Sequence, residues 1–224
     1  MKKILLTPRH SVVLIALCAL AIGNTCSAKQ HDLVPPPDKP ATRASEPIQA
    51  CHRKVIENDL KPFVGKDCLL DVKRGDLTGN GSMDALLVLD SPSVASTALG
   101  QGPTRTIVLL VRGTDGRLHE ASRNSMLVPC AHCGGLYGDP YSYTQAGIGK
   151  FTVVTEGGSR DHWSNKYTFI YSKKQHTWLL EKFISKARDQ LTGKSKSIDL
   201  TAKKFGQIDF SKTDPQDLPK AELP

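Results

Sequence analysis

Residues Gly75–Asp90, GDLTGNGSMDALLVLD, join a short polar loop directly to an apolar run. The run Ala85–Leu89 is apolar at every position, which is typical of a strand that is buried on both faces. A second run of this kind, Ile107–Val111, follows it along the chain. Two such runs predict the central strands of a sheet that is covered on both sides.

Alternating apolar residues predict further strands around these two. Tyr167, Phe169 and Tyr171 alternate on one strand face, and the chain returns over Thr177–Phe183 after a Lys-Lys-Gln-His turn. The sequence therefore predicts a mainly β fold, a single antiparallel β-sandwich or strongly curved sheet. It allows at most one short N-terminal helix, over Cys51–Leu60, which Pro62 would end.

Two further expectations concern the C-terminal half of the domain. We expect Glu156–Asn165 to form a polar loop, because glycine and charged residues dominate it. We also expect Ile208 and Phe210 to lie on a last edge strand.

Composition divides the 224 residues into four parts. Residues 1–28 combine a positive start, an apolar stretch and a small-residue cleavage site, which predicts a secretory signal peptide. Residues 29–50 are rich in proline and polar residues, so we expect a disordered linker. The β domain is expected over residues 51–210, and a disordered tail over residues 211–224.

The expected signal indicates a periplasmic or secreted protein with no transmembrane segment after signal removal. Cys18 and Cys26 leave a lipoprotein as the alternative, but neither follows the small-residue pattern that a lipid-modifying peptidase recognises. The formal net charge is +8, and loss of Lys2, Lys3 and Arg9 with the signal lowers it by three, to about +5. A mild excess of positive charge, spread along an exported chain, argues against nucleic acid as a partner.

The polar loop carries alternating oxygen-bearing side chains, and these are Asp76, Thr78, Asn80, Ser82 and Asp84. Calcium needs about six to eight oxygen ligands, and a turn at Gly81 would bring alternate side chains inward. The loop resembles the D-x-[DN]-x-[DN]-G-x-x-D calcium loops of FG-GAP and VCBS repeats, which precede a strand, although Thr78 departs from that pattern. The alternative is a glycine-rich turn whose side chains bond their own backbone. The loop thus predicts a weak calcium site with a structural role.

Four cysteines remain after signal removal, and they allow three pairings. We expect disulfides Cys51–Cys68 and Cys130–Cys133. The run Cys130-Ala131-His132-Cys133 also resembles the active site of periplasmic thiol oxidoreductases, in which the first cysteine begins a helix that activates its thiolate. The glycines that follow Cys133 argue against such a helix. A zinc site formed by all four cysteines is the third interpretation, and an oxidising compartment disfavours it.

Two loops hold aromatic and charged residues of the kind found in binding patches. The candidate binding residues are Tyr137, Tyr141, Arg160, His162 and Trp163. Ser159, Asp161 and His162 lie too close together in the sequence to form a hydrolase relay by themselves. For Trp163 the alternative is packing onto the sheet beside Trp178.

Three motifs occur in order: GDLTGNGSMDALLVL, CAHCGGLYGDPY, and GGSRDHW followed by YTFIYSKKQHTWLLEKF. This order resembles a family of exported bacterial proteins of uncharacterised activity, over about Asp71–Phe183. The family usually has Asn and Asp where this chain has Thr78 and Asn80, and the resemblance implies no activity. A disulfide-stabilised β scaffold with loops rich in Gly, Tyr, Trp and Arg, and without a credible catalytic set, predicts a non-catalytic envelope module that binds a protein, peptide or glycan. The alternatives are a thiol-disulfide oxidoreductase and a purely structural envelope protein.

Overall fold

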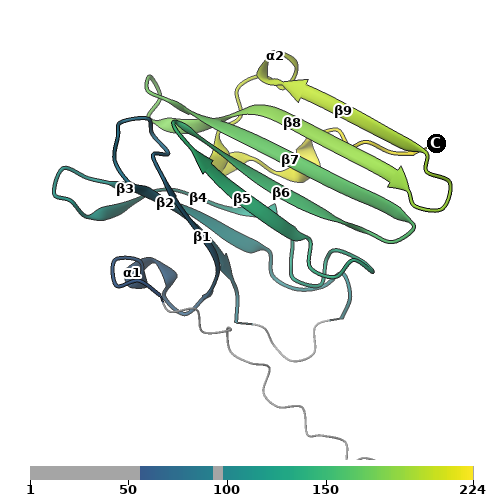
Figure 1. Ribbon diagram of the computed structural model, residues 1–224, viewed down its shortest axis with the longest axis horizontal. Helices are drawn as coiled ribbons and strands as arrows, with labels where there is room; N and C mark the ends of the chain where they lie inside the picture. Colours follow the sequence, from purple (N-terminus) through teal and green to yellow (C-terminus); the bar gives the residue numbers. More distant parts are fainter. Residues whose placement is uncertain (1–55, 93–97, 224) are drawn as a thin grey trace, which may run out of the picture. The chain divides into compact units, whose positions relative to one another are not determined.

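Two antiparallel sheets form the fold in the computed structural model, which describes residues 56–92 and 98–223. The first sheet contains, in this order, β1 (Cys68–Gly75), β2 (Asp84–Asp90), β3 (Arg105–Arg112) and β4 (Leu118–Val128) (Figure 1). The second contains β5 (Tyr141–Gly147), β6 (Lys150–Gly158), β7 (Asp161–Ser172), β8 (Thr177–Asp189) and β9 (Ser195–Thr201). Within each sheet every strand pairs antiparallel with its neighbours in sequence order, so the prediction of a mainly β, antiparallel fold is confirmed.

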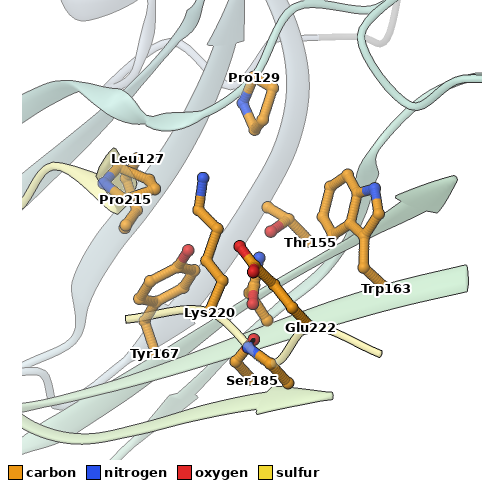
Figure 2. Close-up of a pocket in the computed structure, with 11 residues that line it drawn as sticks. Leu127, Pro129, Thr155, Trp163, Tyr167, Ser185, Pro215, Lys220 and Glu222 are labelled. Atoms are coloured by element: carbon orange, nitrogen blue, oxygen red, sulfur yellow. Dashed lines mark hydrogen bonds between the residues drawn. The ribbon is translucent and has the colours of Figure 1, made fainter. Parts of the chain in front are cut away.

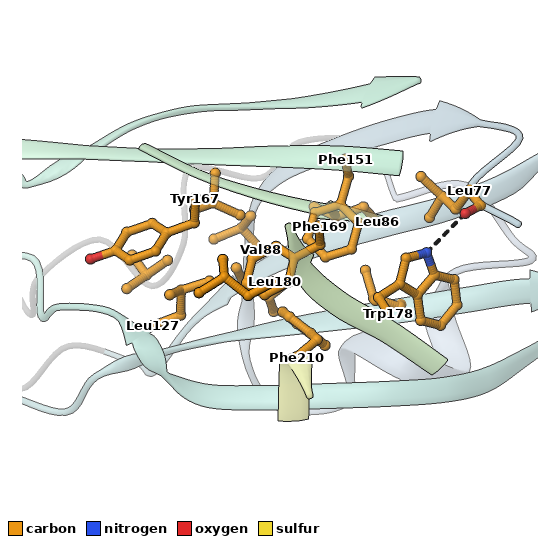
Figure 3. Packing of buried hydrophobic residues seen from close by; sticks show 14 of the residues in the cluster. Leu77, Leu86, Val88, Leu127, Phe151, Tyr167, Phe169, Trp178, Leu180 and Phe210 are labelled. Carbon is orange, nitrogen blue, oxygen red and sulfur yellow. Dashed lines mark hydrogen bonds between the residues drawn. The ribbon is translucent and has the colours of Figure 1, made fainter. Parts of the chain in front are cut away.

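The facing sides of the two sheets share one hydrophobic core (Figure 3). The first sheet contributes alternate residues of its central strands, including Leu86 and Val88 of β2. The second contributes aromatic rings, and Phe151 stacks on Phe169 with ring centroids 4.9 Å apart. Trp178 is buried among them, and its indole N–H donates to the carbonyl of Leu77 at 2.8 Å. This bond ties the polar loop after β1 to the second sheet.

The opposite face of the first sheet has a core of its own. Leu60 and Val64, at the single-turn helix α1 (Lys61–Val64), pack with the residues of β2 and β3 that point away from the second sheet, such as Leu87 and Val108. The central strands β2 and β3 are therefore covered on both sides, as their continuous apolar runs predict.

The position of the N-terminal helix differs from the prediction. The described part of the expected range, residues 56–60, is not helical, and α1 begins at Lys61 with Pro62 in its first turn. Proline suits a first helical turn because its missing N–H would have no helical partner there and its φ angle is already fixed near the helical value. Pro62 thus starts a helix instead of ending one.

The other helical segments are also short. They are the single-turn α2 (Ala202–Phe205) and the 3-10 turns η1 (Phe210–Lys212) and η2 (Pro215–Asp217). Among the described residues, none of the helices has the length and apolar character needed to cross a membrane.

The prediction of a polar loop over Glu156–Asn165 is wrong. β6 continues to Gly158 and β7 begins at Asp161, so only Ser159 and Arg160 lie outside the strands. The strands continue because Gly157 and Gly158 pair with Trp163 and His162 in register. The glycines that suggested a loop instead allow close packing, as described below.

The C-terminal part also differs from the prediction. The edge strand of the second sheet is β9, whereas Phe210 begins η1 and its ring is fully buried against Phe151 and Phe169, at 5.3 Å from each. In the part of the chain that the structure describes, this stretch pairs with β8 through a single bridge, Leu179–Asp209.

The expected disordered tail is ordered over its described part. We call residues 213–223 the C-terminal segment. Asn124 of β4 donates from its side-chain amide to the carbonyls of Phe210 and Thr213, at 2.6 and 2.9 Å. Leu218 and Ala221 are buried, and the Ala221 N–H donates to the Ser185 hydroxyl at 3.0 Å. These contacts compensate for a composition that by itself favours fraying.

The predicted signal peptide, the proline-rich linker and Cys51 lie outside the described residues. They stay predictions.

Candidate functional site

The polar loop before β2 uses its carboxylates to bind its own backbone. Asp76 accepts from the N–H groups of Asn80 and Gly81, both at 2.9 Å. Asp84 is fully buried, and its two oxygens accept from the N–H and hydroxyl of Thr78 and from the N–H of Arg112. Asp84 therefore connects the loop to β3.

This arrangement fits the expected calcium ligands only in part. Asn80 is exposed, whereas Asp76 and Ser82 are half-buried, and the Ser82 N–H donates to the Asn80 side chain. Asp84 is enclosed and its oxygens are engaged by three donors, so it does not fit a ligand position. Among the described residues, no group of three or more His, Cys, Asp and Glu side chains is placed to hold a metal. Calcium binding by the loop stays a prediction.

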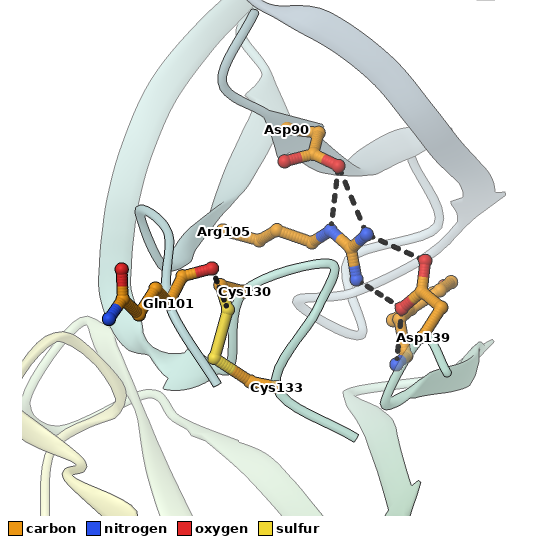
Figure 4. The surroundings of a disulfide bond; sticks show 7 residues. Asp90, Gln101, Arg105, Cys130, Cys133 and Asp139 are labelled. Atoms are coloured by element: carbon orange, nitrogen blue, oxygen red, sulfur yellow. Dashed lines mark hydrogen bonds and ion pairs between the residues drawn. A yellow bond between two sulfur atoms is a disulfide. The ribbon is translucent and has the colours of Figure 1, made fainter. Parts of the chain in front are cut away.

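Cys130 and Cys133 form a disulfide, as expected, with Cα atoms 5.1 Å apart (Figure 4). The Sγ of Cys130 lies 3.1 Å from the Gln101 carbonyl, and Cys130 is only 2% exposed. The pair occupies a turn after β4, without the helix N-terminus that lowers a thiol pKa in redox active sites. Cys68 is also disulfide-bonded, and its partner lies outside the described residues.

The loop that follows the disulfide is held by a buried arginine. Arg105 of β3 is 1% exposed and donates to Asp90 and to Asp139, which lies between Gly138 and Pro140 just before β5 (Figure 4). Burial alone would lower the pKa of Arg105, but the hydrogen bonds and the negative charges of Asp139 and Asp90 raise it above the ordinary value. Asp139 also accepts from the Tyr141 N–H at 2.9 Å, so one carboxylate fixes the loop and starts β5.

The two glycine-rich motifs, C-G-G-x-x-G at Cys133–Gly138 and G-G-S at Gly157–Ser159, pack against each other through their backbones. The Gly158 N–H donates to the Gly134 carbonyl at 2.8 Å, and Gly135 and Gly158 form a parallel bridge. A Cβ on Gly157 would lie 2.9 Å from the Gly134 Cα and 2.7 Å from the indole of Trp163. We call this contact, made by Gly134, Gly135, Gly157 and Gly158, the glycine clasp. It places the disulfide loop next to β6 and β7.

The five candidate binding residues do not form a single surface. Tyr141 is held in place, since its hydroxyl donates to Asp71 at 2.6 Å. Tyr137 is half exposed and its ring lies 4.5 Å from that of His162. Arg160 pairs with Asp189 at 2.8 Å.

Trp163 points to the opposite face of β7 from its neighbour His162, and it is not beside Trp178. On the β7–β8 ladder, Trp163 is opposite Ala187, whereas Trp178 is opposite Tyr171.

Trp163 instead lines a pocket of about 420 Å³ (Figure 2). The second sheet supplies one side of the pocket, the end of β4 and Pro129 supply another, and the C-terminal segment supplies the third. The lining residues are Leu127, Pro129, Thr155, Trp163, Asn165, Tyr167, Ser185, Pro215, Lys220, Ala221 and Glu222. A volume of this size is in the range of ligand pockets.

The floor of the pocket follows from the register of three strands. Thr155 of β6, Asn165 of β7 and Ser185 of β8 are direct cross-strand partners and form one polar row. Trp163 and Tyr167 flank Asn165 at alternate positions of β7, so all three point to the same face of the sheet. The row therefore inserts a polar strip between two aromatic side chains.

The polar groups of the floor differ in their hydrogen bonding. Ser185 accepts from Ala221, and the hydroxyls of Thr155 and Tyr167 interact. Burial raises the pKa of Tyr167 above its ordinary value. The Oδ1 atom of Asn165 is buried and has no hydrogen-bond partner among the described residues, and Asn165 as a whole is 8% exposed.

Sequence reasoning identified Trp163 but missed the rest of the pocket. The alternation of Trp163, Asn165 and Tyr167 is visible in the sequence, and it would have placed Asn165 on the inward face if β7 had been predicted to begin before Tyr167. The contribution of the C-terminal segment has no local signal, because long-range contacts create it.

Comparisons of the chain with protein-family models, with curated proteins and with solved structures found no match.

Proposed function

We propose that the protein is a non-catalytic binding module of the cell envelope or the extracellular space, and that its ligand occupies the pocket next to Trp163. The export signal expected at residues 1–28 supports the compartment. The pocket replaces the exposed loops as the proposed site, because it brings Trp163 together with buried polar groups that converge on one space.

The pocket itself is the observation that carries this proposal, because Trp163, Tyr167 and a cross-strand row of polar side chains border one space of about 420 Å³. Concave sites lined mostly by apolar side chains, with a few convergent polar groups, are the usual form of a ligand site.

The chemistry of the lining supports binding over catalysis. No histidine or cysteine is among the described residues that line the pocket. The two charged lining residues, Lys220 and Glu222, lie on the C-terminal segment and are both exposed. Loops and pockets carried by a stabilised β scaffold are a common basis for recognition without chemistry.

Nuclear magnetic resonance of the two indole N–H groups tests the proposal. Trp163 lines the pocket, whereas Trp178 is buried and bonded to Leu77, so Trp178 is an internal control. Size-fractionated envelope extract should shift the Trp163 resonance and leave that of Trp178 unchanged, and Trp163→Phe identifies the signal. If no fraction moves the Trp163 resonance, the pocket is not a binding site.

A further inference from the structure

We infer that the outer face of the second sheet docks the protein on an anionic lipid surface. The outer face is the side of β6 to β9 that points away from the first sheet. The pocket of Trp163 lies on the inner side of the same strands, so this inference goes beyond the proposed function and does not depend on it.

Positive charge is concentrated on the second sheet. Residues 150–204, which contain β6 to β9, hold twelve basic and five acidic residues. The other described residues, 56–92, 98–149 and 205–223, hold ten basic and fourteen acidic residues. The mild positive excess of the chain therefore has a definite side, and such an asymmetry orients a protein in the field of a charged surface.

Strand alternation places three cations on the outer face. Lys166 of β7 lies between the buried Asn165 and Tyr167, which point inward, so its own side chain points outward. Lys186 and Arg188 of β8 alternate with buried residues of that strand and point outward as well. In the register of the two strands Lys166 and Lys186 are diagonal neighbours, so the three cations form one cluster with neighbours about 7 Å apart.

The cations of this cluster make no ion pair among the described residues, because the carboxylates that flank them contact other groups. Asp199 of β9 pairs with Lys182 at 2.9 Å. Glu156 of β6 lies 3.7 Å from the Nε2 atom of His162. The cluster therefore keeps its positive charge available for a partner.

Serine hydroxyls surround the cluster. Ser164 and Ser197 lie opposite Lys186 on the two neighbouring strands, and Ser195 lies opposite Arg188. Phosphate oxygens accept both charge-assisted hydrogen bonds from lysine and arginine and neutral hydrogen bonds from hydroxyls. Cations and hydroxyls in alternation on a sheet face thus favour a phosphate-bearing partner.

An exposed apolar pair at the edge of the cluster favours a lipid surface over a soluble polyanion. The Tyr137 ring lies 4.5 Å from that of His162, which is the cross-strand partner of Arg188. Tyr137 is 50% exposed, and its neighbour Leu136 is 82% exposed. Binding to a membrane surface combines burial of apolar side chains in the headgroup layer with attraction of cations to anionic lipids. A soluble anionic polymer has no apolar layer for Leu136.

Sedimentation with lipid vesicles tests the inference on the mature protein, without the apolar stretch of residues 1–28. We expect binding to phosphatidylcholine vesicles that contain about 30% phosphatidylglycerol and no binding to phosphatidylcholine alone, because the cations need anionic lipid. Binding should weaken as the salt concentration rises from about 0.05 to 0.3 M, since salt screens exposed charges.

A triple variant tests the cluster itself. Lys166→Gln/Lys186→Gln/Arg188→Gln should weaken vesicle binding about a hundredfold, because each cation near an anionic surface contributes about fivefold. The matched control removes three exposed cations from α1, the turn after it and the β3–β4 turn, and should weaken binding about threefold or less. The control variant is Lys61→Gln/Lys66→Gln/Arg117→Gln.

Spin-labelled lipid provides a second test that needs no variant, so it holds even if the triple variant fails to fold. A nitroxide at the headgroup should broaden the amide resonances of residues 162–168 and 184–188 and leave those of α1 unchanged. Broadening of α1 instead would overturn docking by the outer face.

The remaining outcomes also decide the inference. Equal binding to the two kinds of vesicle, or equal losses in the two triple variants, would overturn it. Binding to polyglutamate or dextran sulfate without binding to vesicles would assign the face to a soluble polyanion and overturn the lipid surface. The vesicle assay does not involve the pocket, so its failure would leave the proposed function standing.

Discussion

The guanidinium of Arg105 holds Asp139 through both of its terminal nitrogens, with Nη2 2.6 Å from Oδ2. The same guanidinium donates to Asp90 from Nε and Nη2, at 3.0 Å each. Arg105 is 1% exposed, whereas the side chain of Asp139 is 45% exposed. The first sheet therefore anchors the loop that leads into the second sheet through a buried cation.

Asp139→Ala should destabilise the protein by about 2 kcal/mol. Removing one partner of a buried pair costs about 3–5 kcal/mol, and the exposure of Asp139 lowers that figure because water screens its charge. Urea unfolding measures the loss. Glu120→Ala is the matched control, since it breaks an exposed pair with Arg123 and should cost less than about 1 kcal/mol. Equal losses for the two variants would contradict a special role for Arg105.

Gly157→Ala should destabilise the fold by about 1–3 kcal/mol by opening the glycine clasp. The new methyl group would meet the Trp163 ring and the Gly134 backbone, which the hydrogen bond from Gly158 holds in place. Gly147→Ala is the control, because the nearest atoms to its Cβ would belong to the flexible Lys150 side chain, at 3.3 Å, and the nearest backbone atom would lie at an ordinary contact distance of 3.8 Å. Thermal unfolding compares the two variants, and Trp163 fluorescence should change only in Gly157→Ala.

Tyr141→Phe should lower stability at neutral pH by about 1.5 kcal/mol, and the difference from the native protein should vanish in acid. Burial alone would raise the pKa of Asp71, but hydrogen bonds from Tyr141 and Lys73 and the charge of Lys73 hold it below its usual range. An Asp whose pKa is lowered by folding stabilises the protein above its unfolded pKa, and this contribution is lost as the pH falls through the folded pKa. The difference between the two proteins should therefore begin to shrink below about pH 4 and should close as the pH falls through the lowered pKa of Asp71. A difference that persists unchanged at pH 3 would show that the bond to ionised Asp71 is not its source.

Much of the fold was predictable because it depends on local patterns. The apolar runs in β2 and β3 and the alternation in β7 and β8 specify strands by the period of their side chains. β5 and β9 were missed because they are polar edge strands whose pairing, and not their composition, makes them strands.

The candidate site was less predictable, for a physical reason. Asn165 is one polar residue in a strand, and it becomes a buried acceptor only when β6, β8 and the C-terminal segment surround it. The glycines at 157 and 158 gave the signal of a loop, although here they permit two backbones to approach closely. Both features arise from contacts between segments that are distant in sequence.

Asp84→Asn should destabilise the protein by about 2 kcal/mol in EDTA and in 10 mM calcium alike. Asp84 is fully buried, and its two oxygens accept from Thr78 and from Arg112. An asparagine side chain has one oxygen and one nitrogen, and because the nitrogen cannot accept, one of these two donors would lose its partner. Chemical unfolding under the two conditions measures the loss. A loss seen only with calcium present would instead make Asp84 a ligand.

The predicted calcium site is tested on the same preparations. With a dissociation constant of about 1 mM, typical of extracellular calcium modules, 10 mM calcium should add about 1.4 kcal/mol and raise the melting temperature by about 3–5 °C. Asp76→Asn should abolish the rise, since Asp76 is the half-buried carboxylate of the loop. Magnesium at the same concentration controls for ionic strength, because it dehydrates reluctantly and prefers an octahedral site. If calcium and magnesium act equally, or if Asp76→Asn keeps the rise, the loop is a turn held by its own backbone and not a calcium site.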